Sequence, residues 1–241
     1  MRNIAIIAER ELGSYLRTPS GYAIAAVALL LNALQLNALA IGDGRRLSAE
    51  VLRIFLGNAA FVVEGAAVLL SMRLLAEERS SGAQTLLFTA PIREGEIVLG
   101  KFLAALALLS LIILLSLYLP ALIFVHGKVS IGHIAAGYVG LFCVGSLTLA
   151  IGTLVSSLAP HPFLAVIGTA TGVGLLELSF FVSDVTEGTL ARLVASFAPV
   201  FGHYPSFRDG ILQLSDLVFF ASGTYLLVLA AVRVLHSQRW R

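Results

Sequence analysis

Six long apolar runs constrain this chain more than any other feature of its sequence. They cover residues 22–41, 54–72, 102–125, 134–158, 163–182 and 217–235. An α-helix needs about 20 residues to cross the roughly 30 Å hydrocarbon layer of a bilayer. The runs are continuously apolar and lack the alternation of barrel strands, so we expect an all-α membrane protein with six transmembrane helices.

The composition excludes soluble and nucleic-acid-binding classes. Hydrophobic residues make up 58% of the chain and charged residues 12%, whereas soluble domains have about 45–50% and about 25%. The formal net charge is only +2, which predicts no nucleic-acid partner. The one cysteine, Cys143, lies in an apolar run and excludes a disulfide framework. We expect residues 1–241 to form a single transmembrane domain.

The distribution of basic residues predicts the orientation. With six crossings both termini lie on one side, and most Lys and Arg residues fall in the termini and in the segment between the second and third runs. The positive-inside rule therefore places both termini in the cytoplasm. The first run begins after residue 20 and is near 20 residues long, so we do not expect a cleaved signal peptide.

Residues 3–17 have the pattern of an amphipathic helix. Ile4, Ile7, Leu12 and Leu16 fall on one stripe, and charged residues lie largely on the other side. We expect an interfacial helix along the cytoplasmic face. A short tail that faces the solvent is the alternative.

The segment at 77–92, between the second and third runs, is the most informative part of the chain. Glu77, Glu78 and Arg79 continue the second helix, and the Ser-Ser-Gly sequence ending at Gly82 breaks it. A short apolar helix then precedes Pro91. Its large side chains are Leu86, Leu87 and Phe88. This short helix would lie across the membrane normal and needs a partner groove or the lipid interface; a purely structural connector is the alternative.

Several polar residues, Asn37 among them, interrupt the apolar runs, and four are candidates for a pathway or an interface. The four are Asn32, Gln35, Glu64 and Glu177. Ionisable groups inside a membrane are costly and usually face protein or water. We expect these residues either to line a pathway or subunit interface, or to be protonated and hydrogen-bonded for structural reasons. Asn32 and Gln35 share a helix face that suits hydrogen bonds between helices.

The loop at 183–215 is long and mixed in composition. Phe197, Phe201, Tyr204 and Phe207 cluster in it, beside two prolines. Aromatic residues at this density suit the headgroup layer. We expect a short helix around residues 190–197 that dips into the outer interface, where it would act as a gate or as an anchor.

The chain shows no catalytic machinery. Residues 95–102 imitate a phosphate-binding loop, but Phe102 stands where that motif needs Ser or Thr to hold magnesium. The five histidines are scattered, and no metal-ligand spacing or catalytic triad is present. We therefore predict a protein that is not an enzyme and that has no cofactor or metal of its own.

The run from Met72 to Phe102 resembles the signature of ABC-2 type exporter permeases, and is closest to the GldF-like branch associated with gliding motility. Residues 9–19 and 207–241 resemble that branch too. The resemblance implies a six-span permease with an N-terminal connecting helix, a coupling helix in the loop at 77–92, and short re-entrant helices before the last span. It also implies a bacterial inner-membrane location.

The resemblance further implies partners. A separate ABC ATPase subunit would bind ATP and Mg and dock on the coupling helix, and a second permease chain would complete a homodimer or heterodimer. A companion protein with a large external domain often accompanies this branch. The residues that would face the ATPase are Glu77, Glu78, Arg79, Gly82, Leu86, Leu87, Phe88 and Pro91. Ala83 and Gln84 depart from the family pattern, where an acidic contact is more usual.

The expected function is thus ATP-driven export of an unidentified substrate. The alternative is a membrane scaffold or mechanical-signalling subunit of a motility or envelope complex. A secondary transporter is disfavoured because the sequence has no paired midplane charges and no broken helices in repeated halves.

Overall fold

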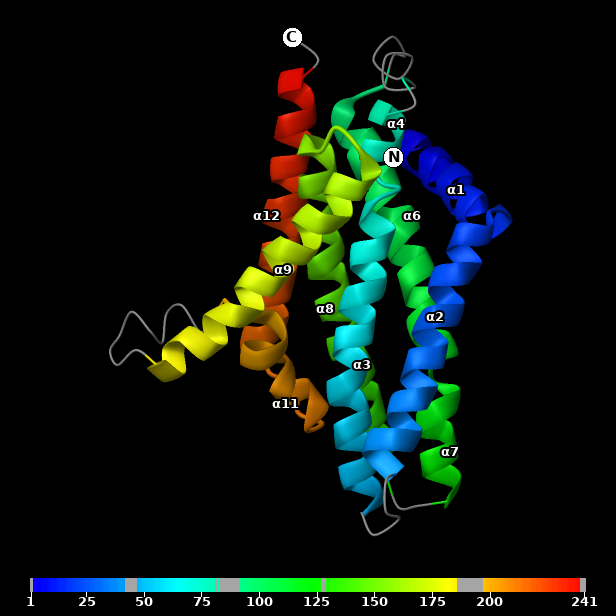
Figure 1. The fold of residues 1–241 in the computed structure, drawn as a ribbon, viewed down its shortest axis with the longest axis vertical. Coiled ribbons are helices and arrows are strands. Elements are labelled where there is room, and N and C mark those ends of the chain that lie inside the picture. Colours follow the sequence, from blue (N-terminus) through cyan, green and yellow to red (C-terminus); the bar gives the residue numbers. More distant parts are fainter. Residues whose placement is uncertain are drawn as a thin grey trace.

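The computed structural model describes residues 2–41, 47–80, 82, 92–126, 129–185 and 197–238. All regular structure in these ranges is helical, and six helices are long and apolar enough to cross a membrane. The all-α fold with six transmembrane helices is therefore confirmed. Figure 1 shows both termini at the same end of the bundle, as six crossings require.

The crossing helices extend beyond the apolar runs that predict them. The first comprises α2 (Pro19–Gln35) and a π-helical turn η1 (Leu36–Ile41), and the second is α3 (Ser48–Ser71). The remaining crossings are α6 (Glu94–Leu115) with α7 (Tyr118–His126), α8 (Ile131–Leu158), α9 (Pro162–Val185) and α12 (Leu214–Gln238). The extensions carry polar residues, because helices continue past the hydrocarbon layer into the interface.

Four shorter elements complete the described chain. They are α1 (Arg2–Arg17), α4 (Ala76–Ser80), the π-helical turn η2 (Pro199–His203) and α11 (Tyr204–Arg208). Helix α1 packs along α6 at the end of the bundle that holds the termini. Turn η2 and α11 lie before α12, where the resemblance implies re-entrant helices, and residues 199–208 are named the re-entrant segment after that expectation. The helix expected around 190–197 lies almost entirely outside the described residues.

The third crossing is interrupted, a feature that its apolar run does not reveal. Helix α6 ends at Leu115 and α7 begins at Tyr118. At the break the buried Ser116 hydroxyl donates to the carbonyl of Ile113, 2.7 Å away, and lies 3.0 Å from the Tyr138 hydroxyl of α8. Such a side-chain bond to the backbone competes with the helical ladder and is a known cause of helix bending.

Helix α8 is the centre of the bundle. It packs against α3, α6, α9, α11 and α12. Its buried glycines face neighbouring side chains so closely that an added Cβ would lie 2.4 Å from Leu56 at Gly137 and 2.5 Å from Phe207 at Gly140. Small residues are typical of membrane helix interfaces, because close van der Waals packing replaces the hydrophobic drive that lipid does not supply.

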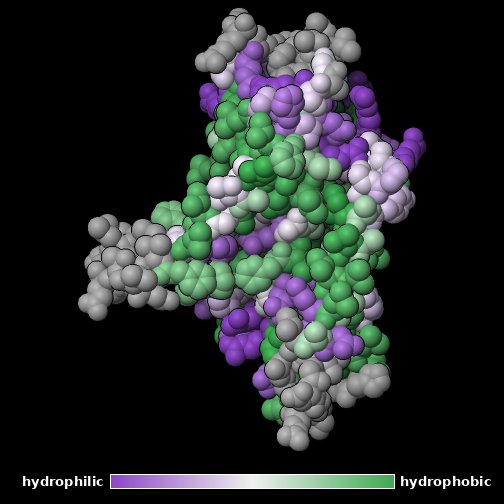
Figure 2. Space-filling model, viewed as in Figure 1, coloured by the Kyte–Doolittle hydropathy of each residue, from purple (hydrophilic) through white to green (hydrophobic). Residues whose placement is uncertain are grey.

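The outer helices present their apolar side chains to the surroundings. Figure 2 shows hydrophobic residues over the middle of the visible face and hydrophilic residues gathered mainly towards its ends. Helix α9 leans away from the bundle towards its C-terminal end (Figure 1). This tilt leaves room between α9 and α3, which η2 and α11 partly occupy.

The close approach at α8 predicts a large effect for a single methyl group. We expect Gly140→Ala to destabilise the purified protein by about 1–3 kcal/mol, since the new Cβ overlaps Phe207 and Tyr204. Thermal unfolding in detergent would measure the loss. Gly174→Ala is the matched control: no atom lies within 4 Å of its added Cβ, so it should leave the melting temperature unchanged or raise it. Equal effects of the two substitutions would contradict the packing described above.

Candidate functional site

Helix α4 begins where the chain turns away from α3. The Ser156 hydroxyl of α8 accepts hydrogen bonds from the backbone N–H groups of Leu75 and Ala76, at 3.0 and 2.9 Å. These bonds satisfy N–H groups that the start of a helix leaves without intrahelical partners. After α4 ends at Ser80, Gly82 adopts a φ of 76°, a left-handed conformation that favours glycine. The base of the loop is therefore fixed to α8.

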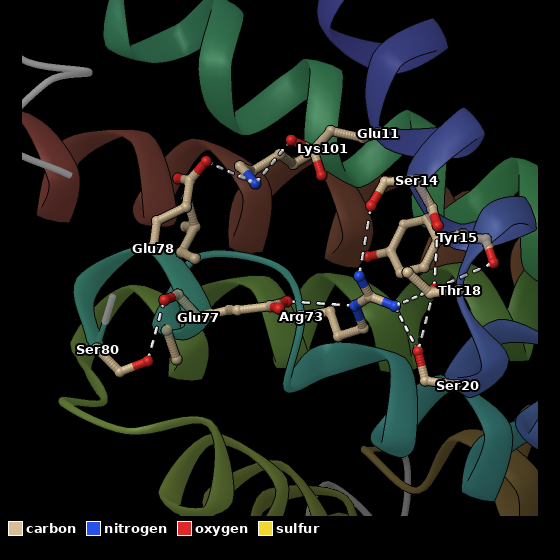
Figure 3. Close-up of polar contacts among 12 residues, drawn as sticks. Glu11, Ser14, Tyr15, Thr18, Ser20, Arg73, Glu77, Glu78, Ser80 and Lys101 are labelled. Carbon is tan, nitrogen blue, oxygen red and sulfur yellow. Dashed lines mark hydrogen bonds and ion pairs between the residues drawn. The ribbon is translucent and has the colours of Figure 1, made fainter. Parts of the chain in front are cut away.

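A buried lysine joins three elements at this end of the bundle (Figure 3). The ammonium group of Lys101 in α6 lies 2.9 Å from a carboxylate oxygen of Glu78 in α4 and 3.2 Å from one of Glu11 in α1. The lysine side chain is only 5% exposed. Removing one partner of such a group leaves a buried charge uncompensated, which is strongly destabilising. The cluster Lys101–Glu78–Glu11 thus holds α1, α4 and α6 together.

Arg73 makes a second junction between the loop and the N-terminal segment. Its guanidinium donates to the hydroxyls of Thr18, at 2.6 Å, and Ser20, and it pairs with Glu77 at 3.2 Å. It also lies 5.0 Å from the centre of the Tyr15 ring, a favourable cation–π arrangement. Burial raises the pKa of the Tyr15 phenol, which keeps the hydroxyl neutral. The bend between α1 and α2 is therefore bound to the end of α3 (Figure 3).

Arg79 makes the third junction. Its guanidinium donates to the carbonyls of Leu158, at 3.2 Å, and Ala159, at 3.4 Å, and to the side-chain oxygen of Gln238. The Gln238 amide in turn donates to the carbonyl of Ser157 at 2.9 Å. Helix α4 is thereby tied to the ends of both α8 and α12.

The structure brings together one half of the predicted coupling residues. Glu77, Glu78 and Arg79 each contact another part of their own chain: Arg73, Lys101 and the end of α8, respectively. Their observed role is to anchor the base of the loop. Four of the predicted residues lie outside the described residues: Leu86, Leu87, Phe88 and Pro91.

Three of the four candidate polar residues in the spans have oxygens without a hydrogen-bond partner in the described part of the chain. These oxygens are Asn32 Oδ1, Gln35 Oε1 and Glu64 Oε1. Asn32 and Glu64 are 3% and 6% exposed. A buried acceptor that lacks a partner carries a desolvation penalty. These acceptors of α2 and α3 are therefore enclosed by their own chain and stay unsatisfied among the described residues.

Glu177 of α9 has a different environment. Its two carboxylate oxygens accept hydrogen bonds from the backbone N–H groups of Val200, at 2.8 Å, and Phe201, at 3.2 Å. These N–H groups belong to the first turn of η2, which lacks intrahelical acceptors for them. The carboxylate thus attaches the re-entrant segment to α9.

Other contacts hold the re-entrant segment against the remaining helices. The hydroxyl of Tyr204 donates to the carbonyl of Leu56 in α3 at 3.0 Å. His203 Nδ1 lies 2.8 Å from the Asp216 carboxylate at the start of α12. Together with Glu177, these contacts connect the segment to α3, α9 and α12.

Sequence reasoning missed the roles of Lys101 and Ser156. Both stand at the edge of an apolar run, and a lysine at such an edge is normally read as an orientation signal. Their partners lie on other elements far away in the sequence, so no local pattern could have identified them. Among the described residues, no three His, Cys, Asp or Glu side chains are grouped as a metal site would require.

Comparison with known proteins gives one family match. The model of the family described as "ABC-2 family transporter protein" matches residues 6–239, nearly the whole chain. No curated protein matches the chain.

The buried lysine predicts a large stability effect. Lys101→Met should lower the free energy of unfolding by about 2 kcal/mol or more, since the partly buried carboxylates of Glu78 and Glu11, with side chains 19% and 22% exposed, would lose their shared cation. Denaturant unfolding in detergent would measure this. Arg53→Met is the control. Arg53 forms an ion pair with Asp209, but its side chain is 53% exposed, so the substitution should lower the free energy of unfolding by less than about 1 kcal/mol. Equal losses would argue against the structural role of Lys101.

The contact of Glu177 predicts a local effect. Glu177→Ala should speed amide hydrogen exchange at Val200 and Phe201 about tenfold or more, because a charge-assisted hydrogen bond is lost. Ser179→Ala on the same helix should not change that exchange, as among the described residues its hydroxyl bonds only to the carbonyl of Leu176. Unchanged exchange in the Glu177 variant would show that the segment is held by other contacts.

Proposed function

The chain belongs to the ABC-2 transporter family, and from this premise we propose that it is the permease subunit of an exporter driven by a separate ATPase. The family match makes it a multi-pass membrane permease. ATP and Mg would bind to the partner ATPase. The substrate is not specified by any residue described above.

The three-way anchoring of α4 is the observation that supports this proposal best. Lys101, Arg73 and Arg79 connect the base of the loop to α1, α6, α8 and α12. A displacement applied to residues 77–92 would therefore be transmitted to most of the helices at this end. An ATPase that contacts this region differently in its two states would shift the permease between two conformations.

The orientation and the oligomeric state follow from the same proposal. The end that holds α1, α4 and both termini would face the cytoplasm, with the ATPase beneath it, in a bacterial inner membrane. A second permease chain would pack against the lipid-facing helices. If the chain belongs to the GldF-like branch, a companion protein with a large external domain would join the complex, and the complex would act in gliding motility.

Substitution of the apolar residues in the loop tests the coupling. Leu86→Asp combined with Leu87→Asp should abolish binding of the ATPase or its stimulation, because charges would replace the apolar docking surface, while the chain still inserts. ATPase activity of the complex, co-purified from its native membrane and reconstituted in vesicles, would be measured together with retention of the ATPase on the tagged permease.

Ile211→Asp combined with Leu212→Asp is the matched control. Both residues are more than half exposed and lie beside the start of α12, away from the termini, so ATPase binding should persist. Wild-type binding and stimulation in the Leu86 and Leu87 variant would contradict the docking assignment. If the wild-type complex shows stimulated ATPase activity but moves no cargo across the vesicle membrane, the chain is a scaffold or mechanical-signalling subunit and not part of an exporter.

A further inference from the structure

A cleft of about 660 Å³ lies between α3, the end of α9 and the re-entrant segment. It belongs to the half of the bundle away from the termini, and none of the residues at the base of the coupling loop lines it. Its volume falls in the range of about 300–1,000 Å³ that is typical of small-molecule sites. The lining changes from charged to aromatic along α3, so the cleft is amphipathic.

The charged end contains an arginine whose charge is only partly matched. Asp209 accepts from Arg53 with both carboxylate oxygens, at 2.6 and 3.1 Å. Arg208 lies 3.5 Å from one of those oxygens, and its buried Nε makes no hydrogen bond in the described chain. Arginine suits phosphate because it offers several donors in a planar fork. Glu50 also lines this end, so a cationic group beside the phosphate would be matched as well.

Gly57 places the Arg208 side chain against α3. A Cβ added at Gly57 would lie 3.3 Å from Arg208 Cδ and 3.8 Å from Nη1. The guanidinium therefore lies along the helix between the level of Arg53 and the level of the aromatic residues, inside the cleft and not beyond its rim.

The other end of the cleft is aromatic and opens sideways. Phe201 packs 5.6 Å from Phe61 and 5.5 Å from Phe180, measured between ring centres. Phe61 is 42% exposed, so this wall faces the hydrocarbon layer. In Figure 2 hydrophilic side chains lie within the hydrophobic belt on the face beside α9. At roughly 1.5 Å per residue, Arg53 and Phe61 lie about 12 Å apart along α3.

We propose that this cleft binds a zwitterionic phospholipid of the surrounding bilayer. The phosphate lies at Arg208, the amine faces Glu50, and one acyl chain runs along the wall of Phe61 and Phe201. The polar and apolar ends are stacked along a transmembrane helix in the order in which a lipid presents its headgroup and its chain. The inference concerns binding alone and does not depend on transport or on the ATPase.

Photolabelling in vesicles tests the site. The full chain would be reconstituted in phosphatidylcholine vesicles with a small amount of phosphatidylethanolamine that carries a diazirine on one acyl chain, irradiated, and analysed by mass spectrometry. Labelling should concentrate in residues 54–61 and 200–205. A diacylglycerol probe with the same chains should label these residues about tenfold less, as the charge-assisted bonds to phosphate are missing.

Two pairs of variants test the two ends separately. Arg208→Gln should reduce labelling about tenfold, and Arg208→Lys, which keeps the charge but not the planar fork, should reduce it less, whereas Arg233→Gln, on the exposed face of α12, should have no effect. Phe61→Trp should reduce labelling by filling the apolar end. Phe124→Trp on α7, where the phenylalanine is equally exposed at 45%, should not.

Three results would overturn the proposal. Labelling spread evenly over α2, α9 and α12 would mean ordinary lipid contact. Equal labelling by the diacylglycerol probe would show that the phosphate does not contribute to binding. Weak labelling combined with cross-links across residues 54–61 of two chains would mean that a second copy covers the cleft.

Discussion

The close approach of other helices to α8 is the constraint on which the rest of the structure depends. Within a bilayer, packing and hydrogen bonds must hold helices together, because lipid chains are as apolar as the side chains. Glycines at 137, 140, 145 and 152 let α3, α6 and α11 reach the backbone of α8. This placement brings Ser156 to the start of α4 and Tyr204 to the carbonyl of Leu56. Both ends of the molecule are thus positioned by the same helix.

The two ends are held by different physical interactions. At the end with the termini, charged side chains dominate, with Lys101, Arg73 and Arg79 each bridging several elements. Charge-assisted hydrogen bonds of this kind depend strongly on geometry, so they suit a junction that moves as one body. At the other end Glu177 and Tyr204 bond to the backbone, and aromatic rings fill the space between helices. This end also holds the cleft between α3, α9 and α11.

Carboxylates in the spans illustrate why residue type alone does not assign a role. Glu64 and Glu177 look equivalent in the sequence, as each is a single acid within an apolar run. In the structure Glu177 holds two N–H groups of η2, while one oxygen of Glu64 has no partner in the described chain. Glu177 is thus part of the fold, whereas Glu64, at 6% exposed, holds a carboxylate oxygen that is buried without a partner among the described residues.

The sequence alone predicts the fold class, the number of crossings and the break after α4, because the hydrocarbon thickness, backbone hydrogen bonding and the left-handed preference of glycine act locally. Its resemblance to ABC-2 type permeases agrees with the family match over residues 6–239. It did not reveal the interruption at Ser116, which depends on a local hydroxyl bond and on Tyr138 of another helix. The packed helices, and no local pattern, show that Lys101 joins Glu78 and Glu11 and that Arg208 lies in a cleft beside Phe61. Those contacts depend on which faces of distant helices meet. Side-chain packing across the bundle determines this, and the periodicity of a single segment does not contain it.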